Sequence, residues 1–189
     1  MIAAKNPITP EQLLRMPDGD QYELVDGKLK ERMAGYKSAR VGAKLTSLLL
    51  QYAELHNLGR IANSDASFQC YSDDPNKVRR PDISYVSFAA LPRDQEPTGH
   101  CRIAPELAVE VISPNDVFEE VAQKAAEYLS AGVKQVWLID PSTEMVYVHH
   151  AGGGRILTNR DELNGADVLP GFCCRVSDLF AIGTSQDSK

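Results

Sequence analysis

The chain has 189 residues, 43% of them hydrophobic and 24% charged, and its formal net charge is −6. This composition is ordinary for a soluble globular protein, and the length fits one domain with a good core. We expect that domain over residues 1–189, with a disordered tail at about 184–189. The acidic balance argues against unselective nucleic-acid binding over the whole surface, but it is compatible with a local basic patch.

Two kinds of sequence signal are missing. No apolar run reaches membrane-spanning length and the N-terminus lacks a signal-peptide pattern, so we expect a cytoplasmic protein. The cysteines have neither zinc nor redox spacing, which predicts reduced thiols with structural roles. They are Cys70, Cys101, Cys173 and Cys174.

The N-terminal half combines short strands with one long helix. Thr9 and Gln12 form the capping-box pattern of a helix start, with Pro10 in the first turn. Asp26-Gly27 is typical of a hairpin turn, and Gly59 suits the position just past a helix end. The expected elements are a short helix ending near Pro17, hairpin strands at 22–25 and 28–33, an amphipathic helix over about 38–57, and strands near Ile61 and at 67–71.

The C-terminal half predicts strands around a second helix. The expected elements are strands at 82–86 and 107–112, a helix from Ser113 to about Ser130, a buried strand at 136–140, a hairpin of 145–149 with 155–158, and a short strand and turn over 169–180. The strand–helix–strand order through the second helix indicates a parallel pair. The sequence therefore predicts an α/β domain around a mixed sheet.

Two of the expected strands carry an acid. Asp82 opens its strand after Pro81, where an acid is common, and Glu110 could face an exposed edge. Glu110, however, has apolar neighbours on either face, and an unpaired buried carboxylate is costly. The residues alone leave ordinary structural acids and a functional pair as equal alternatives. As a pair, they would make an oxygen-rich site for a hard divalent cation, typical of metal-dependent hydrolases that act on phosphodiesters.

Three other polar residues are uninformative on spacing alone. Lys124, in the helix after Glu110, fits a solvated lysine supported by Glu120 one turn earlier. Gln123 lies beside it, and Glu23 is typical of the exposed face of a short strand. None of the three would be selected as functional without further information.

Several other motifs have ordinary interpretations. His149-His150 lacks further ligands at metal spacing and is interpreted as a strand end, and the glycines at 152–154 are interpreted as a turn. A group of basic residues near Asp82 is interpreted as solvated loop charges. These are Lys77, Arg79, Arg80, Arg93 and Arg102.

The order of the motifs resembles the Uma2 family of restriction-endonuclease-like proteins, part of the PD-(D/E)XK nuclease superfamily. The likeness covers nearly the whole chain, from 22–27 to 169–172, and residues 105–141 are its most specific part. The motifs are Pro81-Asp82, a buried strand with Glu110 ending in Ser113-Pro114, Gln123-Lys124, Tyr128 followed by Gly132-Val133, and 136–141. The resemblance implies a restriction-endonuclease-like α/β fold with a central mixed sheet flanked by helices.

The resemblance also assigns roles to residues. The catalytic residues that it implies are Asp82, Glu110, Lys124, Gln123 and Glu23. Asp82 and Glu110 would bind Mg²⁺ or Mn²⁺ with the backbone carbonyl of Val111. Ile112 stands where the superfamily usually has its lysine, so Lys124 from the next helix would replace that lysine. The family's histidine at the start of the long helix is absent from the stretch 36–40.

By this resemblance the chain would be a Mg²⁺-dependent endonuclease that hydrolyses DNA phosphodiester bonds to a 5′-phosphate and a 3′-hydroxyl. Arg79 and Arg80 would hold flanking backbone phosphates. The alternative is a non-catalytic nucleic-acid-binding or assembly protein on the same fold, which the acidic net charge favours. An RNA or small-molecule phosphodiesterase is a further alternative. The oligomeric state is open, and a homodimer is considered because nucleases that cut both strands are often dimers.

Overall fold

The computed structural model describes residues 7–32 and 35–183, apart from the side chain of Phe118. The helical elements are α1 (Pro10–Arg15), the short 3-10 helix η1 (Gly19–Gln21), α2 (Tyr36–Leu55), α3 (Phe118–Ser130) and α4 (Val176–Phe180). The strands are β1 (Tyr22–Val25), β2 (Lys28–Glu31), β3 (Gly59–Asn63), β4 (Ile83–Ser87), β5 (Leu107–Val111), β6 (Gln135–Asp140), β7 (Met145–His150), β8 (Gly153–Leu157), β9 (Glu162–Gly165) and β10 (Leu169–Arg175). The predicted tail at 184–189 lies outside the described residues.

A six-stranded mixed sheet in the order β3-β4-β5-β6-β7-β8 forms the centre of the molecule. Neighbouring strands are antiparallel except β5 and β6, which are parallel. Helix α3 lies between these two strands in the chain, and a parallel pair requires such a crossover. The predicted α/β fold with a mixed sheet and a parallel pair is therefore confirmed.

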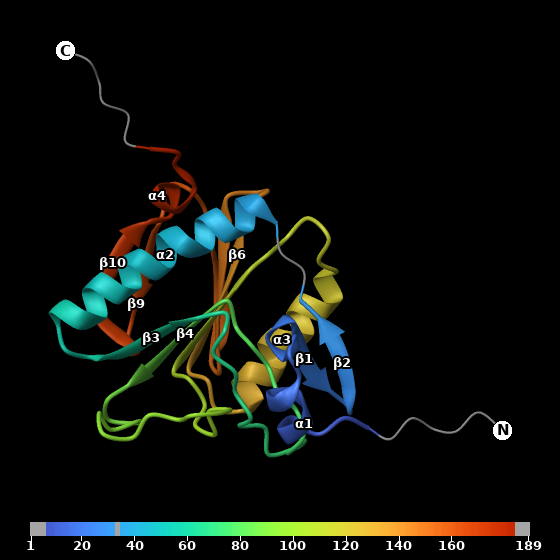
Figure 1. The fold of residues 1–189 in the computed structure, drawn as a ribbon. Coiled ribbons are helices and arrows are strands. Elements are labelled where there is room, and N and C mark those ends of the chain that lie inside the picture. The colour runs from blue at the N-terminus through green and yellow to red at the C-terminus, as the bar shows by residue number, and fades with distance from the viewer. Residues whose placement is uncertain (1–6, 33–34, 184–189) are drawn as a thin grey trace, which may run out of the picture.

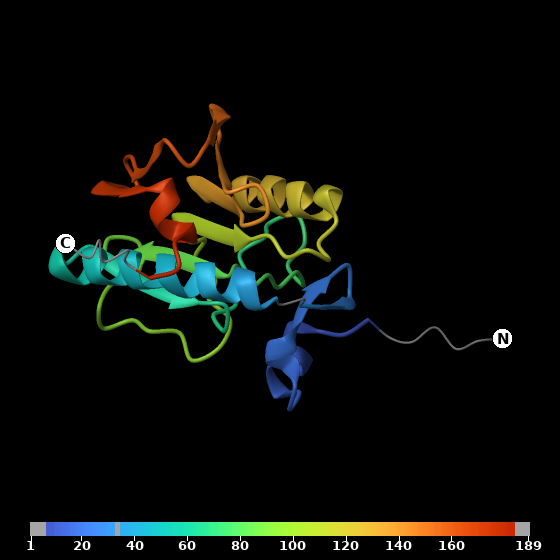
Figure 2. The ribbon, with the colours of Figure 1, turned by 90° about the horizontal axis from the view of Figure 1, so that it is seen from above.

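The two long helices cover opposite faces of this sheet (Figures 1 and 2). Val109 of β5 packs in one hydrophobic cluster with Leu45 of α2, while Ala108 packs in another with Ala125 of α3. Successive side chains of a strand point to opposite faces. Glu110 therefore shares a face with Ala108 and points toward α3.

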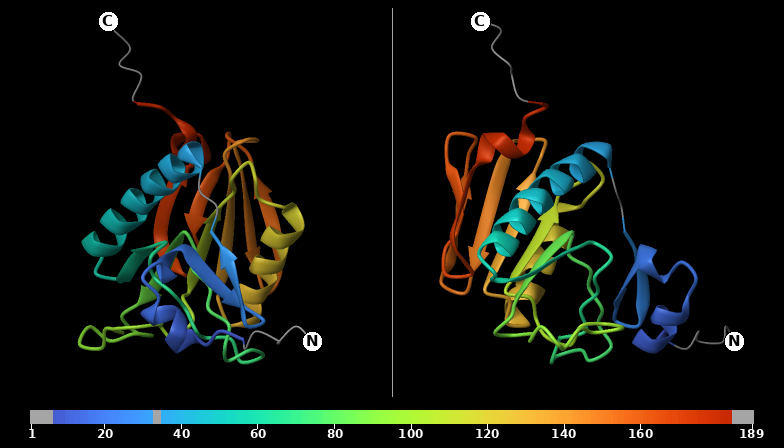
Figure 3. Two further views of the ribbon diagram at one scale, coloured as in Figure 1. Left: turned by 45° about the vertical axis from the view of Figure 1, so that its right-hand side comes forward. Right: turned by 60° about the vertical axis from the view of Figure 1, so that its left-hand side comes forward.

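The β1–β2 hairpin stands at one end of the molecule (Figure 3). Leu24 of β1 forms an antiparallel bridge with Val78, the residue just before the Arg79-Arg80-Pro81-Asp82 segment. Leu24, Val78 and Leu13 of α1 make a small separate core. The hairpin is thus attached to the chain segment that leads into β4.

Several local predictions are confirmed. Thr9 and Gln12 form the capping box of α1, and β1 and β2 pair across the Asp26-Gly27 turn. The four cysteines are free, and His150 ends β7, which pairs with β8 as the predicted hairpin. No helix within 7–32 and 35–183 is long and apolar enough to cross a membrane.

Other local predictions are wrong. Gly59 does not end α2: the helix stops at Leu55, Asn57 takes the left-handed conformation with φ of 58°, and Gly59 begins β3. Residues 67–71 form no regular strand, because Phe68 makes only isolated bridges to Arg79 and Cys101. Strand β9, which pairs with β10, was not predicted.

The start of α3 also differs from the prediction. Asp116 accepts a hydrogen bond from the backbone amide of Ser113 at 2.7 Å, so these residues form a turn. The helix begins only at Phe118. This turn gives the chain room to leave β5 and return along the α3 face of the sheet.

Two glycines offer a test of the packing between α2, β3 and β4. A Cβ on Gly59 would lie 2.7 Å from the Cα of Ser87, so Gly59→Ala must displace backbone and should destabilise the fold by about 1–3 kcal/mol. A Cβ on Gly42 in α2 would meet only a Val111 methyl at 3.7 Å. Gly42→Ala should therefore stabilise the protein by about 0.5–1 kcal/mol through helix propensity. Urea unfolding measures both, and equal effects of the two variants would contradict this packing.

Candidate active site

The pairing of β4 with β5 brings Asp82 and Glu110 to the same end of two strands. Ile83 pairs with Val109, so Asp82, one residue before β4, lies across from Glu110. Here a side chain takes the place of a backbone acceptor: Oδ2 of Asp82 accepts a hydrogen bond of 2.7 Å from the backbone amide of Val111. The two acids that the sequence singled out are therefore neighbours across an antiparallel pair.

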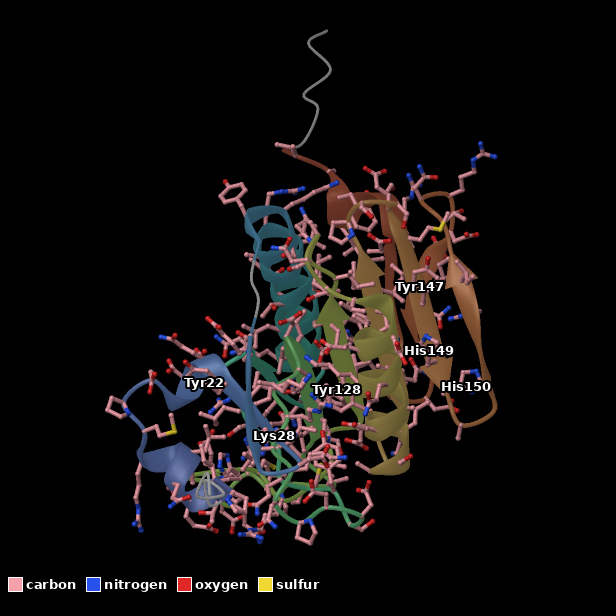
Figure 4. The ribbon with its side chains drawn as sticks, turned by 90° about the vertical axis from the view of Figure 1, so that its right-hand side faces the viewer. Tyr22, Lys28, Tyr128, Tyr147, His149 and His150 are labelled. Atoms are coloured by element: carbon pink, nitrogen blue, oxygen red, sulfur yellow. The ribbon has the colours of Figure 1, made fainter. Side chains whose placement is uncertain are left out.

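Helix α3 brings two side chains to Glu110. Lys124 Nζ lies 3.2 Å from Glu110 Oε2, and the Tyr128 hydroxyl donates a hydrogen bond of 2.6 Å to Glu110 Oε1. Residues four apart occupy the same face of a helix, which explains how both reach one carboxylate. Tyr128 is labelled in Figure 4, which views the molecule from the side on which α3 lies in front of the sheet.

Glu23 from the β1–β2 hairpin completes this group. Its side chain is 3% exposed, and its Oε2 lies 3.3 Å from Lys124 Nζ and 2.9 Å from Arg79 Nη1. Its Oε1 accepts a hydrogen bond of 2.9 Å from the backbone amide of Arg80. The ammonium group of Lys124 is thus held between Glu23 and Glu110, which come from distant parts of the chain.

Arg79 connects this group to Glu127, an acid on α3. Its guanidinium binds Glu127 Oε2 through two nitrogens at 2.7 and 2.9 Å, in addition to its contact with Glu23. The other Glu127 oxygen lies 3.6 Å from Lys77 Nζ and accepts a hydrogen bond of 3.1 Å from Gln123. Gln123 therefore supports the ion-pair network rather than contacting Glu110 directly.

The structure corrects three interpretations of single residues. Lys124 does not pair with Glu120, which binds Lys30 of the hairpin at 3.0 Å. Glu23 is buried rather than on an exposed strand face. The expectation of solvated loop charges fails for the buried Lys77, Arg79 and Arg80.

Arg79 and Arg80 are poorly placed to hold flanking phosphates. The Arg79 guanidinium is engaged by Glu23 and Glu127. The Arg80 guanidinium donates to three backbone carbonyls, of Tyr22, Asp65 and Gly19. Both side chains are committed to holding protein segments together, so the geometry argues against direct phosphate contacts from either.

Burial and neighbouring charges shift the ionisation of the acids. Burial raises the pKa of Glu110 to about 7, with Lys124 offsetting part of the effect and the charge of Asp82 adding to it. Burial also raises the pKa of Asp82. Burial disfavours ionised Glu23 as well, but Lys124 and Arg79 outweigh it and hold its pKa below the usual value. The pair Asp82 and Glu110 is therefore incompletely compensated, whereas Glu23 is fully ion-paired.

A cleft of about 1120 Å³ opens beside these acids. Its walls come from the β1–β2 hairpin, α2 between Ser38 and Leu50, residues 63–65 and the start of α3. Glu23, Asp82, Glu110 and Lys124 line it. The α2 wall includes small residues such as Gly42 and Ala43. A cleft with convergent titratable groups of shifted pKa is a candidate active site.

Comparison with known proteins gives the family. The Uma2 family model, described as "Putative restriction endonuclease", matches residues 10–177. The chain belongs to the Uma2 family. Its fold is similar to the crystal structure of "a putative nuclease belonging to DUF820" from Anabaena variabilis ATCC 29413, with a TM-score of 0.79 and 20% identity over 92% of this chain and 98% of that one. At this identity the likeness concerns the fold. A comparison with curated proteins found no match.

The donor set of this Uma2 protein fits a hard divalent cation held partly by water. Within the described residues no three His, Cys, Asp or Glu side chains are grouped as metal ligands. Asp82 and Glu110 supply two carboxylates with raised pKa values, and a nearby cation would compensate both. Mg²⁺ commonly uses one or two carboxylates and keeps several waters, so two acids suffice.

Two residues of this group were missed by sequence reasoning. Tyr128 was noted only as part of the family motif, although its position four residues after Lys124 placed it on the same helix face. The ion-pair partners of Glu127, Arg79 and Lys77, lie far away in the sequence and could not be inferred from spacing. Both residues lie one turn from a candidate, Tyr128 from Lys124 and Glu127 from Gln123, so their positions on the helix were the available signal.

The shifted pKa of Glu110 predicts a pH-dependent cost in stability. A carboxyl group with a pKa of about 7 in the folded state and 4.5 otherwise stabilises the fold below pH 4.5 and loses that contribution as the pH rises through 7. Glu110→Gln removes this titration and keeps an acceptor for Tyr128. Without divalent cations, its stability relative to wild type should rise by roughly 2–3 kcal/mol between about pH 4.5 and 8, since one pKa unit corresponds to about 1.4 kcal/mol.

Urea unfolding across this pH range checks the prediction. Glu106→Gln is the matched control: hydrogen bonds from Ser87 and Lys134 outweigh burial and lower the pKa of Glu106, so its stability difference should stay flat above pH 4.5. A flat difference for Glu110→Gln as well would show that the Glu110 carboxylate is already fully compensated in the folded protein.

Proposed function

We propose that this Uma2 protein is a Mg²⁺-dependent endonuclease that hydrolyses phosphodiester bonds of DNA. The observation that carries the proposal is the position of Lys124, whose ammonium lies 3.2 Å from Glu110 and lines the same cleft as Asp82. Two acids and a lysine that face one cleft are the components of metal-assisted phosphodiester hydrolysis. The family description and the fold of the Anabaena protein support the same class of reaction.

Asp82, Glu110 and the backbone carbonyl of Val111 would hold the ion. Bound there, Mg²⁺ or Mn²⁺ would polarise the scissile phosphate and lower the pKa of a coordinated water. The Tyr128 hydroxyl holds Oε1 of Glu110 through a 2.6 Å hydrogen bond, which fixes the orientation of the carboxylate. The backbone amide of Val111 does the same for Asp82 Oδ2.

Lys124 would stabilise the negative charge that develops on the phosphate. Glu110 and Glu23 raise the pKa of Lys124 against the opposing effect of burial, so its amine stays protonated at neutral pH. Its side chain is 22% exposed and can therefore meet a ligand in the cleft. A cation that is already positioned costs no reorganisation at the moment of reaction.

Glu23 is better suited to position Lys124 than to bind a second ion. One of its oxygens contacts Lys124 and Arg79, and the other accepts the backbone amide of Arg80. Gln123 steadies Glu127, the second acid bound by Arg79. Both residues would act through neighbouring side chains and not on the substrate.

A non-catalytic nucleic-acid-binding or assembly protein is the alternative, and the acidic net charge of −6 is the property that favours it. RNA or a small phosphodiester would be the alternative substrates for the same chemistry. A cytoplasmic location and a homodimeric state remain predictions from the sequence.

The first test concerns the metal. Calorimetry with wild-type protein should detect weak Mn²⁺ binding, and millimolar Mn²⁺ should raise the thermal midpoint by mass action. Asp82→Asn should lose at least about tenfold in affinity because it removes one of two charged ligands. Asp94→Asn changes an exposed acid outside the cleft and should behave like wild type. Identical Mn²⁺ responses of wild type and Asp82→Asn would exclude Asp82 as a ligand.

The second test concerns cleavage. With Mg²⁺ and duplex, single-stranded or branched DNA, Glu110→Ala should abolish hydrolysis, and Lys124→Ala should slow it by on the order of a hundred- to a thousand-fold. Lys134→Ala is the matched control because it removes an exposed lysine that also pairs with a glutamate. Circular dichroism checks that each variant is folded, and RNA is the substrate control.

The cleavage test separates the alternatives. If wild-type protein cuts no nucleic acid with either Mg²⁺ or Mn²⁺, the binding-protein alternative is the better one. If Lys124→Ala cuts as fast as wild type, Lys124 does not replace the usual lysine of the superfamily even though the protein is a nuclease.

A further inference from the structure

We propose that Arg32 binds a phosphate group of the substrate at the Asp82 end of the cleft. This inference rests on the proposed function, because it assigns a substrate contact within the same site. It replaces the phosphate contacts that the sequence suggested for Arg79 and Arg80.

Among the described residues, five cationic side chains line the cleft: Lys30, Arg32, Arg79, Arg80 and Lys124. Lys30 pairs with Glu120 at the rim, and Lys124 is held between two carboxylates. Arg79 binds Glu23 and Glu127. Three of the five cations are thus in close contact with carboxylates, which leaves Arg32 and Arg80.

Arg80 supplies charge to the cleft but few donors. Its Nε, Nη1 and Nη2 atoms each donate to a backbone carbonyl, and the residue is buried. No carboxylate within the described ranges lies in salt-bridge contact with it. Its positive charge therefore contributes to the potential in the cleft, although its guanidinium is occupied.

Arg32 has both charge and available donors. Its backbone amide donates to the carbonyl of Gln21 at 2.9 Å, and Nη1 donates to the carbonyl of Asp20 at 3.1 Å, so its position is fixed by the hairpin and η1. Its Nη2 lies 3.9 Å from Asp82 Oδ1, which is too long for a hydrogen bond. Of its five N–H groups, only the one at Nη1 has a hydrogen-bond partner among the described residues.

The two arginines reinforce one another. The positive charge of Arg32 adds to burial in lowering the pKa of Arg80, while Asp20, Asp65 and Glu23 act in the opposite direction. Both arginines line the cleft, and among the described residues neither guanidinium has a carboxylate within hydrogen-bond distance, so their charge is available to attract an anion. This end of the cleft is therefore suited to an anionic group, although the protein as a whole is acidic.

The side chain of Arg32 is also accessible. It is 21% exposed, and that of Asp82 is 35% exposed, so a ligand in the cleft can reach both side chains. A planar guanidinium can bind two phosphate oxygens at once, which suits a phosphodiester of a nucleic-acid backbone. A cation bound at Asp82 would compensate the charge of the carboxylate. The weak electrostatic attraction between Asp82 and Arg32 would then decrease further.

The experiment measures binding separately from cleavage. Fluorescence anisotropy with a short labelled DNA strand, in EDTA so that no hydrolysis occurs, compares wild type with Arg32→Ala and Arg32→Lys. Arg32→Ala should weaken binding by about tenfold, which corresponds to about 1.4 kcal/mol, because it removes a charge-assisted hydrogen bond to a phosphate. It should also lower the slope of log affinity against log salt by about one phosphate contact. Arg32→Lys should recover part of the affinity, because it keeps the charge without the bidentate geometry.

Lys28→Ala is the matched control. Lys28 is exposed at the start of β2 (labelled in Figure 4), on the same hairpin as Arg32, and it does not line the cleft. The Lys28→Ala variant removes the same charge as Arg32→Ala. It should leave the affinity and the salt slope within about twofold of wild type, because surface charges away from a binding site contribute little. Equal losses for Arg32→Ala and Lys28→Ala would overturn the inference, since they would indicate only a general field effect.

Failure of this inference is distinguishable from failure of the proposed function. If wild type cleaves DNA while Arg32→Ala binds and cleaves like wild type, the nuclease stands and the Arg32 contact is wrong. If wild type binds the strand without cleaving it and Arg32→Ala binds more weakly with a reduced salt slope, the contact stands in a protein that binds nucleic acid. If wild type binds the strand under none of three conditions (EDTA alone, Mg²⁺ alone and Mn²⁺ alone), the Arg32 contact is overturned.

Discussion

The ammonium group of Lys124 is the point at which three separate parts of the chain meet. Lys124 itself comes from α3. Of its two carboxylate partners, Glu110 comes from the central sheet and Glu23 from the N-terminal hairpin. Removing two buried acids from water is costly, and the shared Lys124 cation, the contact of Arg79 with Glu23 and further hydrogen bonds offset that cost. The hairpin, the sheet and the crossover helix are therefore held in one arrangement by a charge balance as well as by apolar packing.

This balance is incomplete on the side of the cleft. Glu23 is compensated by Lys124 and Arg79, whereas Glu110 and Asp82 retain raised pKa values. A buried, poorly compensated carboxylate is a stability cost that a purely structural site would not keep. The asymmetry divides the network into a part that supports the fold, around Arg79 and Glu127, and a part whose charge a bound cation would compensate, in line with the proposed function.

Sequence reasoning succeeded where the determining contacts are local or follow from strand order. The apolar surroundings of Glu110 indicated a buried acid, and strand order together with the family resemblance led to Asp82 as its neighbour. Spacing failed for Lys124, because the rule for pairs within one helix favoured Glu120 and could not include Glu23, which lies in the hairpin. The resemblance, rather than the residues alone, selected Lys124.

The same limit explains the arginines. Arg79 and Arg80 precede a site acid and are basic, so a substrate contact was a reasonable prediction, but a sequence does not state which carbonyls and carboxylates surround a side chain. The failure at Gly59 has a similar cause: Asn57 supplied the left-handed residue after α2, and the close approach of Gly59 to Ser87 depends on tertiary packing.

The contact of Glu23 with both Arg79 and Lys124 has a consequence for how such sequences diverge. A change at any one of these three positions leaves a buried charge without its partner, while a joint change can keep the sum of charges. The positions should therefore vary together among relatives even though they are far apart in the chain. The N-terminal hairpin would then not be an exchangeable appendage: a chimera that takes the hairpin from one relative and the remainder from another would keep its site only where both parents have matching charges.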